Sequence, residues 1–552
     1  MTRWIALYAC MASAPLVLAQ GTPTSLRPDV QVEHYTDCQS NASRMAWDPV
    51  QERLHYLRTN GDVLMVIDNG FDPPYDTLLY TAADHYIDEA YGMAFHDSDL
   101  FIIGNRVVQN DQLTQGIVHR AHLLPSGERD WSVVAQTDTY IWGGKAHGFN
   151  NVVVGPDEDH LYLNCGSRTD HGEVQNVNGM FPDAREDAIT AKILRIPIDE
   201  HNLALPNDAD QLTASGYLYA SGVRNTYDMA FDADGHLFGV ENSGDHDDPE
   251  EMNWLREGYH YGFPWTAGGN PNATRNFGYA PASDRLLNPG YPSAATDFYY
   301  DATFPSLPGQ QFTEPMRNTG PDADRLRDAV TGGIVDASEA GLDMRTFTCH
   351  RSPLGLVFDK DSVLAADLRG DGFLLSFTPG GDTSGFSVIA PWGIPVVPAD
   401  PSEDLLHLEL HYDDVANDYT VQTTRIAQGF YLPVDAELVG NVLFIIENWS
   451  GTQRSIWKVT MPLASGLAEV PRLPGRQLKV WPVPARDEFF WSTGGLHPNS
   501  LELMDATGKS VVNLAPITNS GQLPLDGVPS GAYVVRATFD TGAASQRIMV
   551  VK

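Results

Sequence analysis

The feature that most constrains the fold is a repeat of apolar strands joined by short polar turns. Six times along the chain, an apolar triplet is followed by a turn of Asp, Gly or Pro and then by a second apolar run. The first copy reads Met45-Ala-Trp47, Asp48-Pro49 and Leu54-His-Tyr-Leu57. Turns of this composition close β-hairpins, so each copy predicts two adjacent antiparallel strands. The triplets begin at Met45, Met93, Val152, Met229, Leu356 and Leu432.

The repeat predicts an all-β fold with a six-bladed β-propeller over residues 21–461. Further apolar strands follow several copies, as at 193–196 and 455–459, and the second strand of the fifth copy is expected at Val363-Leu-Ala365. Residues 256–345, rich in Pro, Gly, Asn and Tyr, predict a long loop excursion on one face, where function tends to reside. An array of β-sandwiches, which would not close into a ring, is the alternative.

The charge of the chain excludes two classes of partner. Asp and Glu number 72 against 35 Lys and Arg, which gives a net charge of −37. A general nucleic-acid binder needs cations for the phosphates, and adhesion to anionic lipid needs a basic surface. We therefore expect neither nucleic acid nor a membrane surface as a partner.

The first 20 residues have the pattern of a secretory signal peptide. A short positive start, Met1-Thr-Arg3, precedes the mostly apolar run from Trp4 to Leu18. No other stretch is apolar for long enough to cross a bilayer, so the mature chain is expected without a membrane span.

The mature chain would keep three cysteines, Cys38, Cys165 and Cys349. Their spacing does not suggest a metal site. An odd number allows at most one internal disulfide, so the sequence favours one pair and one buried thiol without specifying which residues pair.

The last part of the chain predicts a separate small domain. Residues 462–477 hold several Pro and Gly and predict a linker, and β-like runs then extend over 478–552. This module resembles the C-terminal sorting domain of the type IX secretion system of Bacteroidetes, with Trp481-Pro-Val-Pro484 where the family usually has Tyr-Pro-Asn-Pro. The resemblance implies a small β-sandwich that the secretion machinery recognises and that is removed on export. A small adhesion-like β-sandwich is the alternative.

Three ordered motifs in the fourth repeat carry a second resemblance. They are Gly222-Val-Arg224-Asn225, an acidic loop that ends in Glu251-Met-Asn253, and Gly258-Tyr-His-Tyr261-Gly262-Phe-Pro264. Over roughly 40–462 the chain is similar to the soluble sugar dehydrogenases that use pyrroloquinoline quinone, the glucose/sorbosone dehydrogenase family. The resemblance implies a secreted aldose dehydrogenase that oxidises a sugar at its anomeric carbon, transfers the hydride to the quinone and passes electrons to an external acceptor.

The resemblance also implies roles for individual residues. His147, just before the third triplet, matches the position of the family's catalytic base, and histidine suits proton removal near neutral pH. Arg224 is implied to stabilise charge during the reaction, because a guanidinium binds carboxylates and oxyanions in a fork. The residues implied to bind the quinone are Arg224, Asn225, Arg369 and Arg425, and those implied to hold calcium are Ser243, Gly244 and Asp245.

A second function stays open from the sequence: a non-catalytic propeller that binds glycan or protein on its loop face. The acidic loop begins Glu241-Asn-Ser-Gly244, where the family usually has Glu-x-Gly-Pro. Geometry distinguishes the two functions, because an enzyme requires His147, Arg224, Arg369 and the loop 242–251 to converge at one mouth of the central channel.

Overall fold

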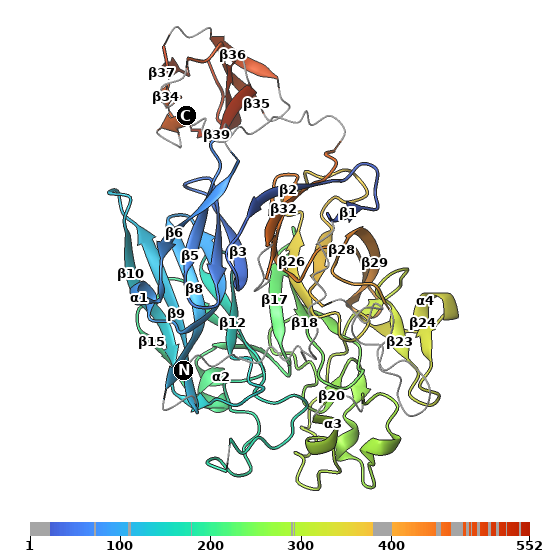
Figure 1. Ribbon diagram of the computed structural model, residues 1–552. Helices are drawn as coiled ribbons and strands as arrows, with labels where there is room; N and C mark the ends of the chain where they lie inside the picture. Colours follow the sequence, from blue (N-terminus) through green and yellow to red (C-terminus); the bar gives the residue numbers. More distant parts are fainter. Residues whose placement is uncertain are drawn as a thin grey trace. The chain divides into compact units, whose positions relative to one another are not determined.

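The chain is mostly β-strand, as predicted, and its few helices are short (Figure 1). The computed structural model describes residues 22–378 without 71–72, 109–111, 178, 289–290 and 292, residues 400–448 and 454–464, and residues 478–551 without 482–484, 487, 494–496, 506–508, 515–517, 526 and 540–541. The predicted signal peptide and residues 465–477 of the predicted linker lie outside the described residues.

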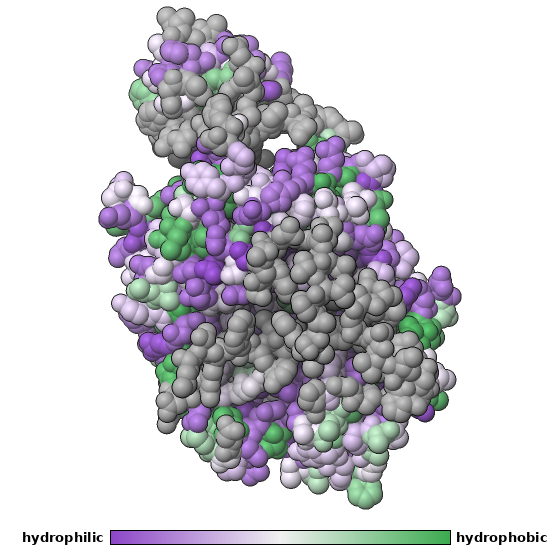
Figure 2. All heavy atoms as spheres, viewed as in Figure 1, coloured by the Kyte–Doolittle hydropathy of each residue, from purple (hydrophilic) through white to green (hydrophobic). Residues whose placement is uncertain are grey.

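The described residues form two compact units. The larger comprises those of 1–66 and 76–464, and the smaller those of 465–552 with 67–75. Within the described residues, no helix is long and apolar enough to cross a membrane. On the face shown in Figure 2, hydrophilic residues cover most of the coloured surface and hydrophobic residues gather in small patches.

Six mainly antiparallel sheets of three or more strands build the larger unit. The first three sheets are β3 (Ala42–Asp48), β4 (Arg53–Arg58), β5 (Val63–Ile67) and β6 (Tyr75–Tyr80); β7 (Glu89–His96), β8 (Asp99–Val108), β9 (Leu113–Leu123), β10 (Arg129–Thr137), β11 (Tyr140–Ile141) and β15 (Leu203–Leu205); and β12 (Phe149–Val154), β13 (His160–Cys165), β14 (Lys192–Pro197) and β16 (Leu218–Ser221).

The other three sheets are β17 (Thr226–Phe231), β18 (Leu237–Glu241) and β19 (Glu251–Leu255); β26 (Pro353–Phe358), β27 (Gly372–Ser376), β28 (Asp404–Asp413) and β29 (Asp418–Gln428), joined by β1 (Thr24–Ser25), β22 (Arg317–Asn318) and β25 (Met344–Arg345); and β30 (Pro433–Val439), β31 (Val442–Glu447), β32 (Ser455–Thr460) and β2 (Gln31–Asp37). The N-terminal β2 thus completes the last sheet by pairing with β32. The six predicted triplets fall on strands of six different sheets, β3, β7, β12, β17, β26 and β30, except that Leu432 directly precedes β30; these six are called the first strands.

The first strands contact one another in the order β3, β7, β12, β17, β26 and β30, and β30 contacts β3 again. Arg44, near the start of β3, shows how tightly they meet. Its guanidinium donates to the carbonyls of Asn150 in β12 and Tyr227 in β17, and it pairs with Asp228 at 2.8 Å and Asp435 at 3.3 Å. These partners lie near the starts of their own strands, so the first strands run in one direction around the ring. The six strands line a cavity of about 380 Å³.

The fifth repeat departs from the prediction, because Val363–Ala365 form no strand and β27 is the second strand of that sheet. The carboxylate of Asp359 accepts hydrogen bonds from the backbone of Val363, Leu364 and Gly370, which folds this segment into a loop. Leu364 is buried there as a loop residue, so its apolar character marks the core and not a strand.

The predicted excursion between the fourth and fifth sheets contains little regular structure. Besides β22 and β25, which join the fifth sheet, its elements are the paired β20 (Thr266–Ala267) and β21 (Asn270–Pro271), the paired β23 (Arg325–Arg327) and β24 (Ile334–Asp336), the turns η1 (Ala273–Arg275) and η2 (Pro281–Ser283), and the helices α3 (Ser293–Thr296) and α4 (Ala337–Ala340). The helices outside it are α1 (Ala82–His85) and α2 (Ala209–Ala214).

The three cysteines of the larger unit are all free and buried, so the predicted disulfide is wrong. Cys38 contributes to the core beside the first sheet, and Cys165 to the core between the second and third sheets. Each thiol is held apart from the others by the packing of its own part of the chain.

The smaller unit consists of two sheets. One contains β33 (Lys479–Trp481), β34 (Glu488–Ser492) and β37 (Ser520–Pro524), and the other β36 (Ser510–Leu514), β35 (Ser500–Asp505), β38 (Gly531–Phe539) and β39 (Gly542–Val550). Phe489 and Trp491 of the first sheet and Leu501 and Val535 of the second belong to one buried hydrophobic core. This unit therefore has the core that an independent domain requires.

Candidate active site

His147 lies in the loop before β12, at the end of the ring where the first strands begin. Its backbone N–H donates to the carbonyl of Ser167, and its Nδ1 lies 3.0 Å from the same oxygen. Gly166 makes this approach possible, because a Cβ at Gly166 would lie 2.6 Å from the Cβ of His147. Burial, with the positive charge of Arg224, lowers the pKa of His147 to about 3. The neutral ring then donates from Nδ1 to Ser167 and keeps Nε2 as an acceptor.

Arg224 precedes β17 and links the loop of His147 to the acidic loop. Its Nε donates to the Asp170 carbonyl at 2.8 Å, its Nη2 to the Asp170 carboxylate at 2.9 Å and its Nη1 to the Asn242 carbonyl at 2.8 Å. Its own carbonyl accepts from the Ser167 N–H at 2.6 Å. Three of the five guanidinium N–H groups are thus used by described residues.

The acidic loop between β18 and β19 closes around Asp170. The N–H of Asp245 donates to the Asp170 carboxylate at 3.2 Å, and a Cβ at Gly244 would lie 2.8 Å from that carboxylate. Asp245 also pairs with Lys145 at 3.4 Å. Ser243 keeps a buried hydroxyl oxygen without a hydrogen-bond partner among the described residues. The candidate calcium residues therefore lie beside His147 and Arg224.

Asp170 and Lys145 organise this site, and neither was predicted from the sequence. Burial opposes the ionisation of Asp170, but the hydrogen bond from His171 and the charges of Lys145 and Arg224 outweigh it and hold the pKa of Asp170 well below its usual range. His171 also stacks on Phe298, with 4.0 Å between ring centroids. The available signal for Asp170 was a charged run, Arg168-Thr-Asp170-His171, that begins three residues after the end of the buried strand β13.

Two buried carboxylates face each other behind Arg224. Asn253 donates to Glu241 at 2.9 Å and to Glu251 at 3.0 Å. Burial raises the pKa of Glu241 to about 7, and burial with the charge of Glu241 raises the pKa of Glu251 to about 8. Both glutamates, with Asn242 and Ser243, line a cavity of about 10 Å³, which is room for roughly one water molecule.

The other candidate residues lie elsewhere or serve other partners. Asn225 accepts a hydrogen bond from Asn150 at 2.8 Å beside His147. Arg369 is exposed in the turn between β26 and β27, where a first strand ends, so it lies at the opposite end of the ring and the predicted convergence fails for this residue. Arg425 on β29 pairs with Asp404 at 2.6 Å and Asp322 at 3.2 Å.

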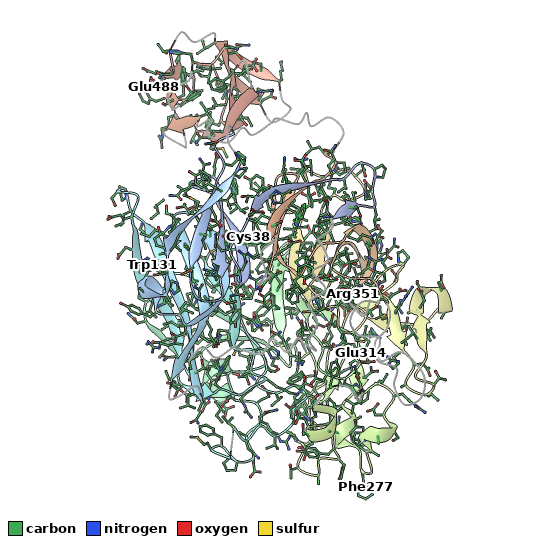
Figure 3. All side chains as sticks on the ribbon, viewed as in Figure 1. Cys38, Trp131, Phe277, Glu314, Arg351 and Glu488 are labelled. Carbon is green, nitrogen blue, oxygen red and sulfur yellow. The ribbon has the colours of Figure 1, made fainter. Side chains whose placement is uncertain are left out.

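Arg425 belongs to a buried ion network in the fifth sheet. Arg351, labelled in Figure 3, is fully buried and pairs with Asp400 at 2.5 Å and Asp404 at 2.7 Å. Arg425 also reaches Asp400, at 3.4 Å. In this network the guanidinium of Arg425 pairs with carboxylates of the chain itself. The structure therefore does not place Arg425 with His147.

Two family models match the chain. Residues 97–321 match the model for glucose/sorbosone dehydrogenase, and residues 479–551 match the model for the secretion system C-terminal sorting domain. The first match contains His147, Arg224 and the acidic loop but neither Arg369 nor Arg425.

No curated protein matches the chain. Among solved structures, it is similar to the aldose sugar dehydrogenase of Streptomyces coelicolor in its PQQ-bound form, at 14% identity and a TM-score of 0.45 over 79% of this chain and 99% of that one. It is also similar to the soluble aldose sugar dehydrogenase of Escherichia coli, at 12% identity and a TM-score of 0.46 over 78% of this chain and 99% of that one. A third similar structure is the PQQ domain of pyranose dehydrogenase from Coprinopsis cinerea, at 11% identity and a TM-score of 0.48 over 80% of this chain and 98% of that one. Residues 97–321 are thus similar to the glucose/sorbosone dehydrogenase family, and residues 479–551 to the secretion system C-terminal sorting domain.

Proposed function

We propose that the chain is an exported aldose dehydrogenase that oxidises a sugar at its anomeric carbon and transfers the hydride to pyrroloquinoline quinone. The observation that carries the proposal is the convergence of His147, Arg224 and the acidic loop within the segment that matches a sugar dehydrogenase family. Calcium and an external electron acceptor complete the proposed system.

The architecture we propose is a six-bladed β-propeller over residues 21–461, a linker over 462–477 and a sorting domain of β-sandwich form over 478–552. The first strands of six sheets contact one another in a closed circle, and this arrangement supports the propeller. The pairing of β2 with β32 supports it further, because joining the two ends in one sheet stabilises a closed ring. The match at 479–551 supports export by the type IX machinery after removal of a signal peptide at 1–20.

His147 is the proposed base. A neutral imidazole with Nδ1–H held by Ser167 presents Nε2 to accept the hydroxyl proton of the sugar. Arg224 supplies a positive charge beside the developing alkoxide, and its bonds to Asp170 fix its position. Proton removal and charge stabilisation are thus assigned to two residues from adjacent sheets.

The residues present fit the two absent groups in part. When bound, the quinone supplies the hydride acceptor and calcium supplies a Lewis acid. Two N–H groups of Arg224 make no hydrogen bond to a described residue and are available to a quinone carboxylate, with Asn225 beside them. The unpartnered hydroxyl of Ser243, the carbonyls of 243–244 and the carboxylate of Asp245 provide the oxygen donors that calcium prefers. We leave Arg369 and Arg425 out of the proposed quinone site.

A non-catalytic propeller that binds glycan or protein on its loop face remains the second candidate. It is favoured by the engagement of Arg224 with Asp170 and by the placement of Arg369 at the other end of the ring. Under this alternative, the same loops would bind a ligand without turnover.

Reconstitution distinguishes the two functions. The full chain is loaded with pyrroloquinoline quinone and calcium, and dye reduction is measured over a panel of aldoses before and after chelation. The enzyme proposal predicts turnover with at least one aldose and its loss on chelation. A chain that binds the quinone stoichiometrically yet reduces no dye with any sugar would favour the binding propeller.

A further inference from the structure

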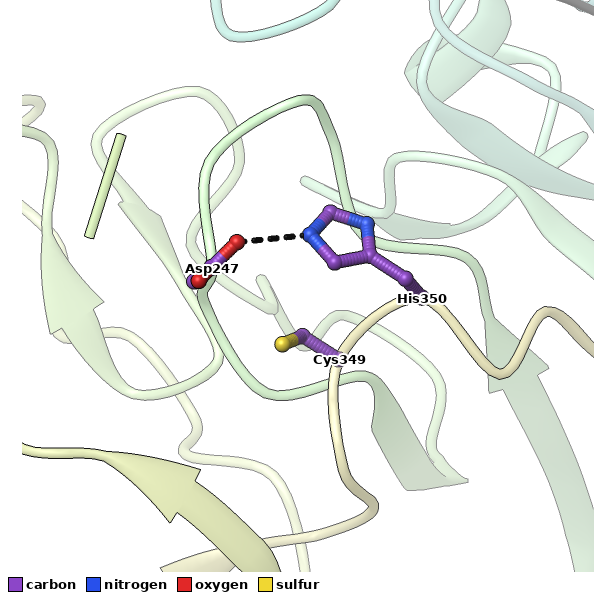
Figure 4. Close-up of side chains that lie close together, drawn as sticks. All are labelled: Asp247, Cys349 and His350. Carbon is purple, nitrogen blue, oxygen red and sulfur yellow. Dashed lines mark hydrogen bonds and ion pairs between the residues drawn. The ribbon is translucent and has the colours of Figure 1, made fainter. Parts of the chain in front are cut away.

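Three side chains with different metal-binding atoms meet beside the fourth and fifth sheets. Asp247 comes from the acidic loop after β18, and Cys349 and His350 come from the segment before β26. Their ligand atoms, one from each residue, all lie within 4.8 Å of one another. Figure 4 shows the Asp247 carboxylate directed at the His350 ring and the Cys349 sulfur close to both.

We propose that Asp247, Cys349 and His350 form a site for Zn²⁺, with one carboxylate oxygen, Sγ and Nε2 as ligands. A set of one oxygen, one sulfur and one nitrogen suits Zn²⁺, whereas Ca²⁺ and Mg²⁺ prefer oxygen alone. Three protein ligands leave the fourth tetrahedral position for water. This site uses donors other than those proposed for calcium and does not depend on the dehydrogenase proposal.

An outer contact already orients the carboxylate. Arg327 Nε donates to Asp247 Oδ2 at 2.6 Å, and both side chains are 1% exposed. Asp247 Oδ1 is left facing His350 Nε2, at 2.8 Å. Ligands of metal sites are commonly held in this way by a second hydrogen bond.

The Cys349 thiol has no such partner. It is buried and free, and it makes no hydrogen bond to a described residue. Burial, with the charges of Asp247 and Glu250, raises the pKa of Cys349 well above its usual range. A bound divalent cation lowers the pKa of the thiol again, because its positive charge compensates the surrounding carboxylates and stabilises the thiolate.

The Asp247–His350 pair lies close to the spacing that a bound ion requires, and Cys349 Sγ lies within 4.8 Å of both ligand atoms. Zn–N and Zn–O bonds of about 2.0–2.2 Å in a tetrahedron place the two ligand atoms roughly 3.3 Å apart. The Asp247–His350 pair must therefore open by about half an ångström from its 2.8 Å hydrogen bond. Binding releases the proton of the thiol and the proton between His350 and Asp247, so two protons leave for each ion.

Cobalt tests the site, because Co²⁺ replaces Zn²⁺ in such sites and a bound thiolate gives a near-ultraviolet charge-transfer band. The full chain is titrated with Co²⁺ and then with Zn²⁺. We expect one equivalent of Co²⁺ with the thiolate band, displacement by Zn²⁺, and loss of the band in Cys349→Ser. His350→Gln should weaken binding by at least about tenfold, since it removes a ligand. Cys38→Ser, at another buried free thiol, is the matched control and should keep the band.

X-ray absorption on the zinc-loaded wild type makes the test independent of the folding of variants. We expect one sulfur at about 2.3 Å with a shell of nitrogen and oxygen at about 2.0–2.2 Å. A shell of nitrogen and oxygen alone, a thiolate band unchanged in Cys349→Ser, or no stoichiometric binding would each overturn the proposal.

Discussion

The protonation state of His147 depends on its neighbours and not on its own sequence context. Burial and the nearby Arg224 lower its pKa to about 3, and the Ser167 carbonyl selects the tautomer. The motif predicted the residue, but its state follows from residues 20 and more positions away in the sequence. Asp170 is the residue that connects these groups.

Replacing Asp170 with Asn should destabilise the chain. The carboxylate is buried and pairs with Arg224 and His171, so its removal leaves buried cations without compensation. Breaking a buried pair in this way typically costs about 3–5 kcal/mol. Urea unfolding measures the change, with the exposed Asp97→Asn as control. A loss of the same size in both variants would contradict the role of Asp170.

Acid should destabilise the larger unit through a different residue, His119. Burial lowers the pKa of His119 from 6.5 to about 4, and neither ring nitrogen has a partner among the described residues. As the pH falls below 6.5, His119 becomes protonated in the unfolded chain but stays neutral in the folded chain. The free energy of unfolding therefore decreases between about pH 6.5 and 4, by roughly 3 kcal/mol at most. His119→Phe should flatten this part of the urea-stability profile relative to the wild type. The exposed His122→Gln should not, and equal slopes in all three proteins would refute the assignment.

At the scale of elements, closure of the ring depends on β2. This strand supplies the fourth member of the last sheet by pairing with β32. Deletion of residues 22–37 would leave β32 as an open edge and uncover part of its core, including Trp457. Calorimetry should show a lower and broader unfolding transition than that of the full chain. An unchanged midpoint would mean that β2 does not close the fold.

Periodicity in the sequence was sufficient for the hairpins but not for every strand. The Met45 and Met229 triplets were recognisable because apolar residues and turn residues alternate locally. The strand predicted at Val363–Ala365 was wrong, because a short apolar run buried in a loop has the same pattern as a strand. The loop forms only because Asp359 binds its backbone, and nothing in the run itself reports that contact.

The site shows the same division between local and distant information. His147 and Arg224 stand in motifs, whereas Lys145 and Asp170 acquire their roles only when loops from different sheets meet. Arg369 fits its motif locally but lies where a first strand ends, because the strand expected before it does not form. Contacts made by the closing ring therefore decide which motif residues share a site.

At the scale of the whole molecule, both ends of the chain should be removed on export. The match at 479–551 and the apolar leader predict that a host with type IX secretion releases a protein without residues 1–20 and without the C-terminal domain. Intact-mass measurement of the medium tests this directly. Recovery of chains that still end at Lys552 would contradict the sorting-domain assignment.

The central claim concerns the reaction itself, and an aldose labelled with deuterium at its anomeric carbon tests it most directly. The full chain, loaded with pyrroloquinoline quinone and calcium, is mixed with the labelled sugar, and the product and its rate of formation are followed in a single turnover. The account predicts a lactone without deuterium, slower formation than from unlabelled sugar, and a rate lower by about 10²–10⁴ in His147→Ala at equal quinone occupancy. His34→Ala, on the exposed face of β2, should match the wild type. A wild-type chain that forms no lactone, or His147→Ala that forms it equally fast, would contradict the account.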